Sequence, residues 1–154
     1  MVKEELIIVC DTREQIPLWD KGIVRRKLET GDYSFILNGV NYSDKIAVER
    51  KSLIDLYGTL GKGHKRFKKE LERSLNLDYF AIVIEGSYSS CYNKDFNNNH
   101  YSKMRGYVVT AILFTLHIKY GINIFFCNGR KESKRIIKEL FNAYVKHNNN
   151  IKKE

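Results

Sequence analysis

Three side chains near the middle of the chain have the types and the spacing needed to bind a metal beside a phosphate group. Asp32 opens one run of β-forming residues, and Glu49 and Lys51 stand two residues apart on the next. Because successive side chains of a strand point to opposite faces, Glu49 and Lys51 share one face and Arg50 points to the other. An acid and an amine are therefore expected to act together.

The turn between the two runs decides whether Asp32 reaches that face. A two-residue turn at residues 38–39 pairs Asp32 with about Lys45. A four-residue loop over 39–42 pairs it with Glu49 instead. We expect the longer loop.

Two carboxylates brought within a few Å of each other repel, which raises a pKa unless a cation lies between them. A hard divalent ion suits this position because it binds one or two carboxylates together with waters and phosphate oxygens. Asp32 and Glu49 are therefore predicted to hold Mg2+ or Mn2+, which lowers the pKa of a bound water. Lys51 is predicted to orient that water or to offset charge that grows on the phosphate.

These residues belong to a longer pattern. Gly31-Asp32 is followed by E-R-K-x-x-x-D at residues 49–55 and preceded by D-x-R-E at residues 11–14. The pattern resembles the nuclease domain of the XPF family of structure-specific DNA endonucleases, over roughly residues 6–145. The resemblance implies an α/β fold like that of restriction endonucleases, with a mixed central sheet flanked by helices. It also implies hydrolysis of phosphodiesters at branched, flap or fork DNA, in repair or recombination.

The resemblance extends to the other motif residues. It implies that the backbone carbonyl of Arg50 is a metal ligand, and that Asp11 and Glu14 lie near the metal. Either carboxylate would bind a second metal or hold waters of the first, so Asp11 joins the predicted ligands. Asp55, one helical turn past Lys51, is expected to orient Lys51 or Arg50 by a salt bridge.

Basic side chains predict a DNA-binding surface. Four of them recur at steps of four, three and four residues and would form one ridge on a helix, where they neutralise phosphates. A solvated lysine-rich face is the alternative. A basic residue near the start of the last helix opposes the helix dipole, which indicates either a bound phosphate or plain surface. The residues predicted to contact DNA are Arg13, Lys62, Arg66, Lys69, Arg73 and Arg130.

Composition fits one domain that binds a polyanion. A chain of 154 residues with 43% hydrophobic content buries a single core, here assigned to residues 1–147. Twenty-seven Lys and Arg against eighteen Asp and Glu give a charge of +9, which suits DNA or an acidic membrane surface. No run reaches the ~18 apolar residues of a membrane span, and no signal-peptide pattern opens the chain. Three separated cysteines are expected to be buried free thiols, as in an intracellular protein.

The hydrophobic pattern alternates strands with helices. Strands are expected over residues 6–10, 23–28, 79–85 and 122–127, with a hairpin over 32–51 between them. Helices are expected over 52–60, 64–75, 104–120 and 131–145, and a disordered basic tail over 148–154. Residues 86–101 are expected to form a long loop. Its aromatic residues Tyr88, Tyr92 and Phe96 either stack on unpaired bases or fold back on the core.

Three functions are compatible with these residues. The first is the metal-dependent endonuclease described above, and the second is a resolvase-like or restriction-like nuclease of the same superfamily. The third is a catalytically silent DNA-binding partner subunit. A homodimer through the last two helices, or a complex with a partner subunit, is expected in addition.

Overall fold

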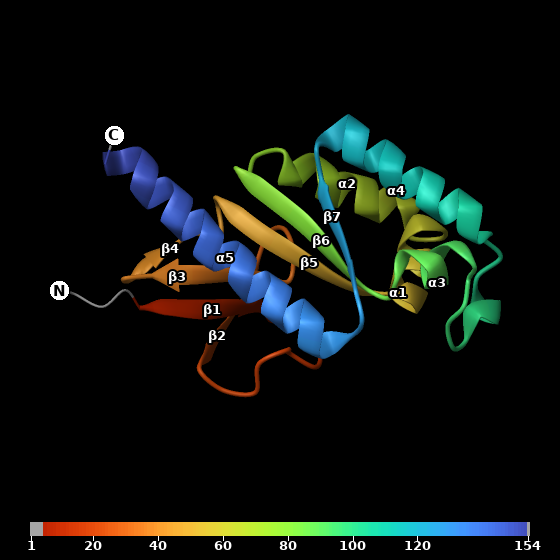
Figure 1. The fold of residues 1–154 in the computed structure, drawn as a ribbon, viewed down its shortest axis with the longest axis horizontal. Helices are drawn as coiled ribbons and strands as arrows, with labels where there is room; N and C mark the ends of the chain where they lie inside the picture. Colours follow the sequence, from red (N-terminus) through yellow and green to blue (C-terminus); the bar gives the residue numbers. More distant parts are fainter. Residues whose placement is uncertain (1–4, 154) are drawn as a thin grey trace.

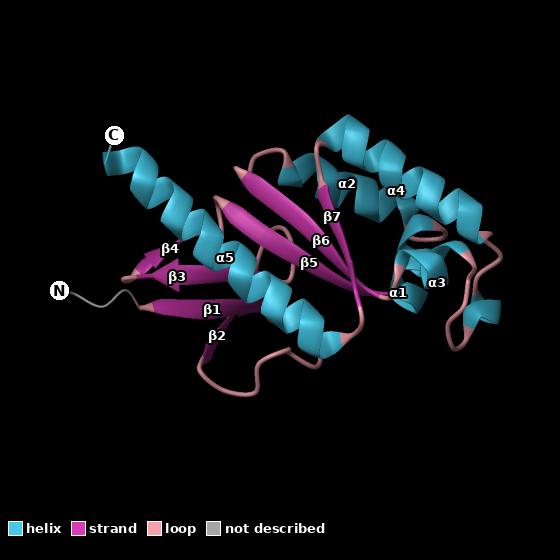
Figure 2. Cartoon of the chain, in the orientation of Figure 1, coloured by secondary structure: helices cyan, strands magenta, loops and turns pink. Residues whose placement is uncertain are grey.

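One mixed sheet with helices on both faces makes up the part of the chain described by the computed structural model, residues 5–153 (Figures 1 and 2). The strand order is β2-β1-β3-β5-β6-β7, with β4 paired to β3. Pairs β1–β3 and β3–β5 are antiparallel, whereas β1–β2, β5–β6 and β6–β7 are parallel. The strands are β1 (Leu6–Asp11), β2 (Ile23–Arg26), β3 (Tyr33–Leu37), β4 (Val40–Asn41), β5 (Ile46–Ser52), β6 (Tyr79–Glu85) and β7 (Asn123–Cys127).

The helices divide between the two faces, which confirms the fold class predicted from the sequence. Helix α5 lies along one face of the sheet (Figure 1). On that face Phe141 packs in a cluster with Phe35 and Val83. Helices α1, α2 and α4 cover the other face, which receives Ile82 and Ile84 of the same strand β6. The helices are α1 (Leu53–Leu60), α2 (His64–Ser74), α3 (Tyr88–Tyr92), α4 (Gly106–Tyr120) and α5 (Arg130–Lys153), with a 3-10 turn at Asn99–Tyr101.

The connection from β3 to β5 has two turns in place of the one loop we expected. A two-residue turn at residues 38–39, with positive φ at both positions, joins β3 to β4. The pairing of Leu37 with Val40, if continued, would place Tyr33 opposite Asp44. Tyr33 instead pairs with Val48, four residues further on.

The second turn produces this shift in register. The carbonyl of Tyr42 accepts hydrogen bonds from the backbone N–H groups of Lys45 and Ile46, so the chain bends again before β5. The expected four-residue loop over 39–42 is therefore wrong. The strand pairing that this loop was expected to produce is nevertheless correct. Tyr33 pairs with Val48, so the next residues along the two strands, Asp32 and Glu49, lie opposite each other.

Two segments contain more helix than the sequence indicated. Residues 86–101 include the short helix α3, capped by the Ser87 hydroxyl, which accepts a hydrogen bond from the backbone N–H of Ser90. Helix α5 continues to Lys153 in place of the tail expected from residue 148; residue 154 lies outside the described part. The helix continues because each residue added to a formed helix gains one backbone hydrogen bond. Contact also supports it, since Asn148 and Asn149 lie partly buried near Tyr42.

The three cysteines are free and buried, as predicted. None of the helices within residues 5–153 has the length and apolar character needed to span a bilayer.

Candidate active site

Asp32 and Glu49 form a carboxyl pair where β3 begins beside β5. The two side chains share a hydrogen bond, and Asp32 Oδ2 also accepts the backbone N–H of Arg50 at 2.8 Å. Gly31 permits this approach. Its φ is +81°, and a Cβ there would lie 3.0 Å from the Ala47 side chain and 3.1 Å from the Val48 carbonyl oxygen. The two carboxyl groups that the sequence predicted as metal ligands are thus brought together.

Burial and mutual repulsion perturb both acids. Burial raises the pKa of Glu49, which is only 5% exposed, and the neighbouring Asp32 carboxylate raises it further. Burial also raises the pKa of Asp32, although the hydrogen bond shared with Glu49 acts in the opposite direction. The surroundings of Glu49 therefore favour its protonated form more strongly than those of Asp32 do. A carboxyl pair of this kind has the oxygen ligands that a divalent cation prefers.

Lys51 extends from the same face of β5 as Glu49, as predicted. Its Nζ lies 3.9 Å from Glu49 Oε2 and 6.0 Å from the centre of the Phe67 ring. The side chain lines an open cleft of about 380 Å3 that Arg66 and Glu70 of α2 also line. An ammonium group and a basic helix thus border one cleft, and the ammonium group lies between that cleft and the buried Glu49 carboxyl.

Asp11 lies beside the pair without joining it. Its backbone N–H donates to the Asp32 carbonyl, but its carboxylate accepts hydrogen bonds from Leu28 N–H at 2.7 Å and Arg13 Nε at 2.8 Å. Burial raises the pKa of Asp11, and these hydrogen bonds outweigh that effect and lower it. Within residues 5–153, no three His, Cys, Asp or Glu side chains gather closely enough to hold a metal. The Asp11 carboxylate is bonded to Arg13 and Leu28 in this arrangement, and its role as a third ligand stays a prediction.

The other motif acids differ in position from what was expected. Glu14 lies on the α5 side of the sheet, where its two oxygens pair with Arg50 Nε and Nη2 at 3.1 and 3.2 Å. Arg50 also pairs with Glu85, and the ion pair of Lys51 is with Glu49. Within residues 5–153, Asp55 forms no ion pair with Arg50 or Lys51, so the salt bridge expected for Asp55 is absent. Asp55 instead borders both the Lys51 cleft and the Arg50 cleft.

The predicted DNA-binding residues are dispersed. Arg66 is exposed on α2 beside Lys51, and Lys69 and Arg73 follow it along the helix. Lys62 does not lie on that helix, because Gly63 caps α2 and the helix begins at His64. The predicted ridge therefore contains three helical residues.

Two further arginines hold the chain together near the site. The Arg13 side chain is 64% exposed although it is bonded to Asp11. Arg130 donates to the carbonyl oxygens of Ile16 and Pro17, which anchors the segment after β1 to α5. Both arginines line a polar cleft of about 370 Å3 with Glu14 and Arg50.

Sequence reasoning missed Glu70, Glu85 and Ser133. Glu70 Oε1 accepts the Gly31 N–H at 3.3 Å, and its charge contributes to the raised pKa of Glu49. Its position four residues after Arg66 on α2 was a usable signal. Glu85 and Ser133 lie far apart in sequence, and no local pattern connects them.

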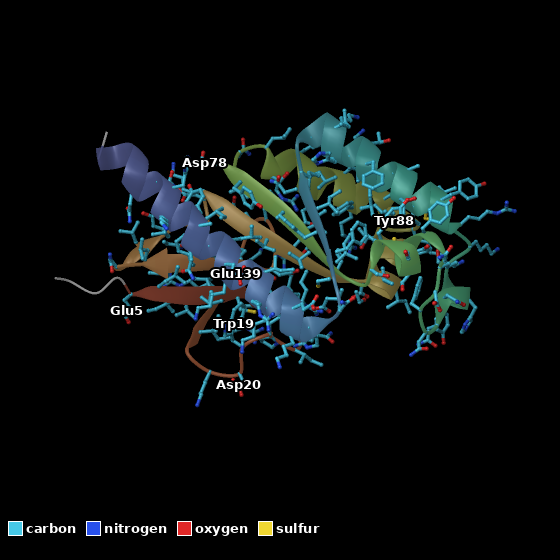
Figure 3. The ribbon with its side chains drawn as sticks, viewed as in Figure 1. Glu5, Trp19, Asp20, Asp78, Tyr88 and Glu139 are labelled. Carbon is cyan, nitrogen blue, oxygen red and sulfur yellow. The ribbon has the colours of Figure 1, made fainter. Side chains whose placement is uncertain are left out.

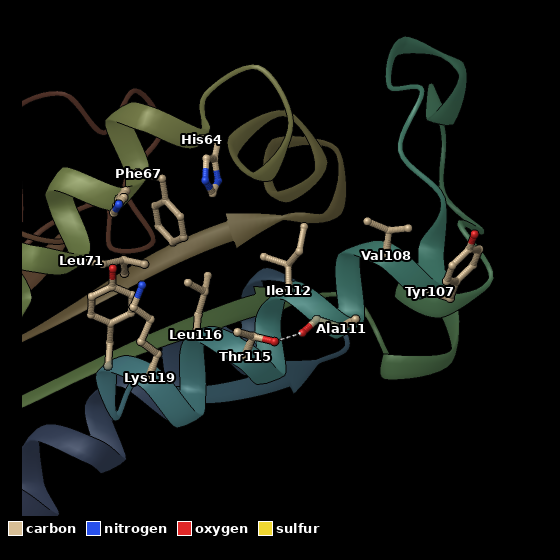
Figure 4. Close-up of a pocket in the computed structure, with 12 residues that line it drawn as sticks. His64, Phe67, Leu71, Tyr107, Val108, Ala111, Ile112, Thr115, Leu116 and Lys119 are labelled. Atoms are coloured by element: carbon tan, nitrogen blue, oxygen red, sulfur yellow. Dashed lines mark hydrogen bonds between the residues drawn. The ribbon is translucent and has the colours of Figure 1, made fainter.

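A larger hollow of about 450 Å3 lies between α2 and α4 (Figure 4). Its lining is mostly apolar and contains no carboxylate; Figure 4 shows Phe67, Ile112 and Leu116 pointing into it. Phe67 also borders the Lys51 cleft. The hollow lacks the carboxylates needed to bind a metal, so the Lys51 cleft is the candidate site.

Known structures share this arrangement of strands and helices. XPF from Aeropyrum pernix superimposes with a TM-score of 0.66 at 21% identity, over 89% of this chain and 60% of that one. XPF from Aeropyrum pernix in complex with DNA gives 0.64 at 23% identity, over 92% and 66% of the respective chains. This chain thus spans 60% and 66% of the lengths of those two proteins. The fold is that of XPF.

The sequence matches the ERCC4 domain family over residues 10–140, and the chain belongs to that family. No curated protein sequence matches it. The family predicted from the D-x-R-E, G-D and E-R-K-x-x-x-D motifs is therefore confirmed.

Proposed function

We propose that this chain is a divalent-metal-dependent DNA endonuclease that hydrolyses phosphodiesters at branched, flap or fork DNA. The observation that supports this most strongly is the pair of Asp32 and Glu49 with Lys51 alongside, at a cleft bordered by Arg66. Membership of the ERCC4 domain family supports a nuclease, and the fold shared with XPF in complex with DNA supports DNA as the partner.

The donor set fits Mg2+ or Mn2+. Two hard carboxylate groups that lie next to each other and are largely removed from water gain most from a cation placed between them. Asp32 and Glu49 would hold it, with the Arg50 carbonyl as a further oxygen ligand. When bound, such an ion polarises a phosphate oxygen and supplies hydroxide near neutral pH.

The protein groups have separate tasks in this proposal. Lys51 lies where it donates hydrogen bonds to a water or to a non-bridging phosphate oxygen, which offsets the negative charge that develops there. Glu70 holds Gly31, and with it the start of β3, against α2. Arg66 binds a neighbouring phosphate, because it is exposed on the rim of the same cleft.

The test is a cleavage assay with labelled flap, fork, four-way junction and linear duplex DNA, in Mg2+, Mn2+ or EDTA. We expect cutting of branched DNA that EDTA abolishes. Equal cutting of linear duplex would favour a restriction-like nuclease. Tight binding of branched DNA without cutting in either metal would favour a silent partner subunit and refute the proposal.

Arg66→Ala is expected to weaken DNA binding about 5- to 10-fold and to make the plot of log K against log salt shallower by about one unit. The physical reason is the loss of one neutralised phosphate. Fluorescence anisotropy across a salt series measures both quantities. Lys146→Ala, which removes an exposed lysine from α5, is the matched control and is expected to leave the slope unchanged. An unchanged slope for Arg66→Ala would remove Arg66 from the interface.

A dimer through α4 is a further part of the proposal. Phe114 and Ile118 of α4 are 47% and 81% exposed. The Tyr88 ring is tilted against the Phe114 ring, with 6.2 Å between the ring centres. Tyr88 is labelled in Figure 3. The described side chains of α5, over residues 130–149, form no comparable surface, because Ile137 and Phe141 pack against the sheet. A second copy of the chain, or a partner subunit, would cover the α4 surface.

Phe114→Glu is expected to turn a dimer into a monomer, since a charge at the centre of an apolar contact is costly. Light scattering during gel filtration gives the mass. Leu75→Glu replaces an exposed apolar residue at the end of α2 and serves as the control that should remain dimeric. A wild-type protein that is monomeric at micromolar concentration would contradict a homodimer.

A further inference from the structure

A buried chain of hydrogen bonds connects the first turn of α5 to the end of β5. Ser133 Oγ donates to Glu85 Oε2 at 2.6 Å, and Glu85 Oε1 accepts from Arg50 Nη1 at 2.6 Å. Glu14 holds the other side of the Arg50 guanidinium. Ser133 is fully buried, and the side chains of Glu85 and Arg50 are 8% and 14% exposed.

Stability alone is a weak reason for this arrangement. Removing charges from water costs several kcal/mol per ion, and apolar replacements of buried ion pairs are often neutral or stabilising. Two carboxylates, one guanidinium and a hydroxyl instead define a single geometry for Arg50. The residue they fix lies between Glu49 and Lys51 on the strand.

The end of β5 has limited support from its sheet neighbours. Its residues from Glu49 onward pair with β6 on one edge, whereas pairing with β3 ends at Val48. On that second edge the Arg50 N–H donates to the Asp32 carboxylate. Arg50 therefore connects the carboxyl pair, through its backbone, to the α5 network, through its side chain.

We propose that Glu85 and Ser133 are positioning residues for the active site. They fix the Arg50 guanidinium on the α5 face, and through the backbone of β5 this sets where Glu49 and Lys51 point on the opposite face. The inference rests on the proposed function. It identifies α5, which contributes no group to the Lys51 cleft, as the element that aligns that cleft.

The test compares two buried serines. Ser133→Ala removes the hydroxyl that holds Glu85, and Ser133→Thr keeps a hydroxyl at the same position. Ser74→Ala is the matched control, because Ser74 is also buried and its hydroxyl donates to the Leu71 carbonyl of its own helix. For each variant we would measure Tm, Kd for flap DNA in Ca2+, and single-turnover cleavage in Mg2+.

Both alanine variants are expected to lower Tm by a few degrees. Only Ser133→Ala should slow cleavage, by about 10- to 100-fold, because a displacement of 1 Å in a reacting group has an effect of that size. Its Kd for DNA should stay the same, and Ser133→Thr should restore the rate. Ser133→Ala that cleaves as fast as Ser74→Ala would overturn the inference.

A second measurement separates this inference from the proposed function. If the wild type cuts no DNA, the endonuclease proposal fails, and calorimetric binding of Mn2+ then tests the positioning role. We expect Ser133→Ala to weaken Mn2+ binding about tenfold and Ser74→Ala to leave it unchanged, because a metal site loses affinity when the groups that hold its ligands in place are removed. An equal Kd in the two variants, or no Mn2+ binding by the wild type, would refute the positioning role.

Discussion

Lys51→Met is expected to lower the rate of DNA cleavage by about 1,000-fold, since removal of one preorganised donor from a site of charge development has effects of that size. Lys51 Nζ lies 3.9 Å from Glu49 Oε2, and the side chain is 18% exposed; among residues 5–149 no other lysine forms an ion pair with Glu49 or Asp32. Methionine is unbranched and similar in length to lysine, so it fills the same space beside the Phe67 ring without the ammonium group. The fold and the Kd for DNA should therefore remain nearly unchanged.

Single-turnover kinetics with a flap substrate in excess Mg2+ measures this effect. Lys69→Met is the matched control, because Lys69 is an exposed lysine on α2, and its loss should affect binding alone. A Lys51→Met protein that cleaves within about tenfold of the wild type would show that the ammonium group has no part in the reaction.

Glu49→Gln is expected to stabilise the metal-free protein at pH 7.5, by about 1–4 kcal/mol. Glu49 is buried beside Asp32, and burial together with the Asp32 charge raises its pKa. Glutamine keeps the shape of the side chain and a hydrogen-bond donor for Asp32 while removing the repulsion. For a domain of this size, each kcal/mol corresponds to about 2–4 °C in Tm.

The pH dependence of this effect has a definite sign. A folded-state pKa above the ordinary value means that the folded protein retains a proton that the unfolded chain has lost. The protonated Glu49 therefore adds to the free energy of unfolding. This addition is fully present below the ordinary pKa of about 4, and it is lost as the pH rises through the raised pKa of the folded protein. The Tm difference between Glu49→Gln and the wild type should therefore be small at low pH and grow toward neutral pH.

Thermal unfolding from pH 4.5 to 8, in EDTA and separately in Mg2+ without EDTA, tests this prediction. Mg2+ should raise the Tm of the wild type at pH 7.5, because a ligand that binds only the folded state stabilises it, and should leave Glu49→Gln nearly unchanged. A wild type that is more stable than Glu49→Gln in EDTA at neutral pH would mean that the two carboxyls do not repel.

The sequence predicted much of the fold and the centre of the site, for identifiable reasons. Strand periodicity placed Glu49 and Lys51 on one face, and the spacing between the two strands placed Asp32 opposite Glu49. The turn that achieves this was predicted incorrectly. A tight turn at residues 38–39 followed by a second turn at Tyr42 has the same effect on register as one longer loop.

Contacts between elements that are distant along the chain could not be predicted from the sequence. Asp11 has the residue type and the motif of a ligand, but Arg13 two residues later turns back onto it, and only coordinates reveal that pairing. Ser133 and Glu85 are 48 residues apart and meet because α5 packs on the sheet beside β6. Asp55 fits a salt bridge by helical spacing, but Glu14 and Glu85 already occupy Arg50.

The most direct test is a crystal of the protein grown with Mn2+ and measured at a wavelength where manganese scatters anomalously. We expect one strong peak between the carboxyl groups of Asp32 and Glu49, at about 2.0–2.3 Å from an oxygen of each. The Lys51 ammonium should stay outside the ligand shell and face the cleft. A peak coordinated by Asp11 instead, or no peak at this pair in millimolar Mn2+, would contradict it.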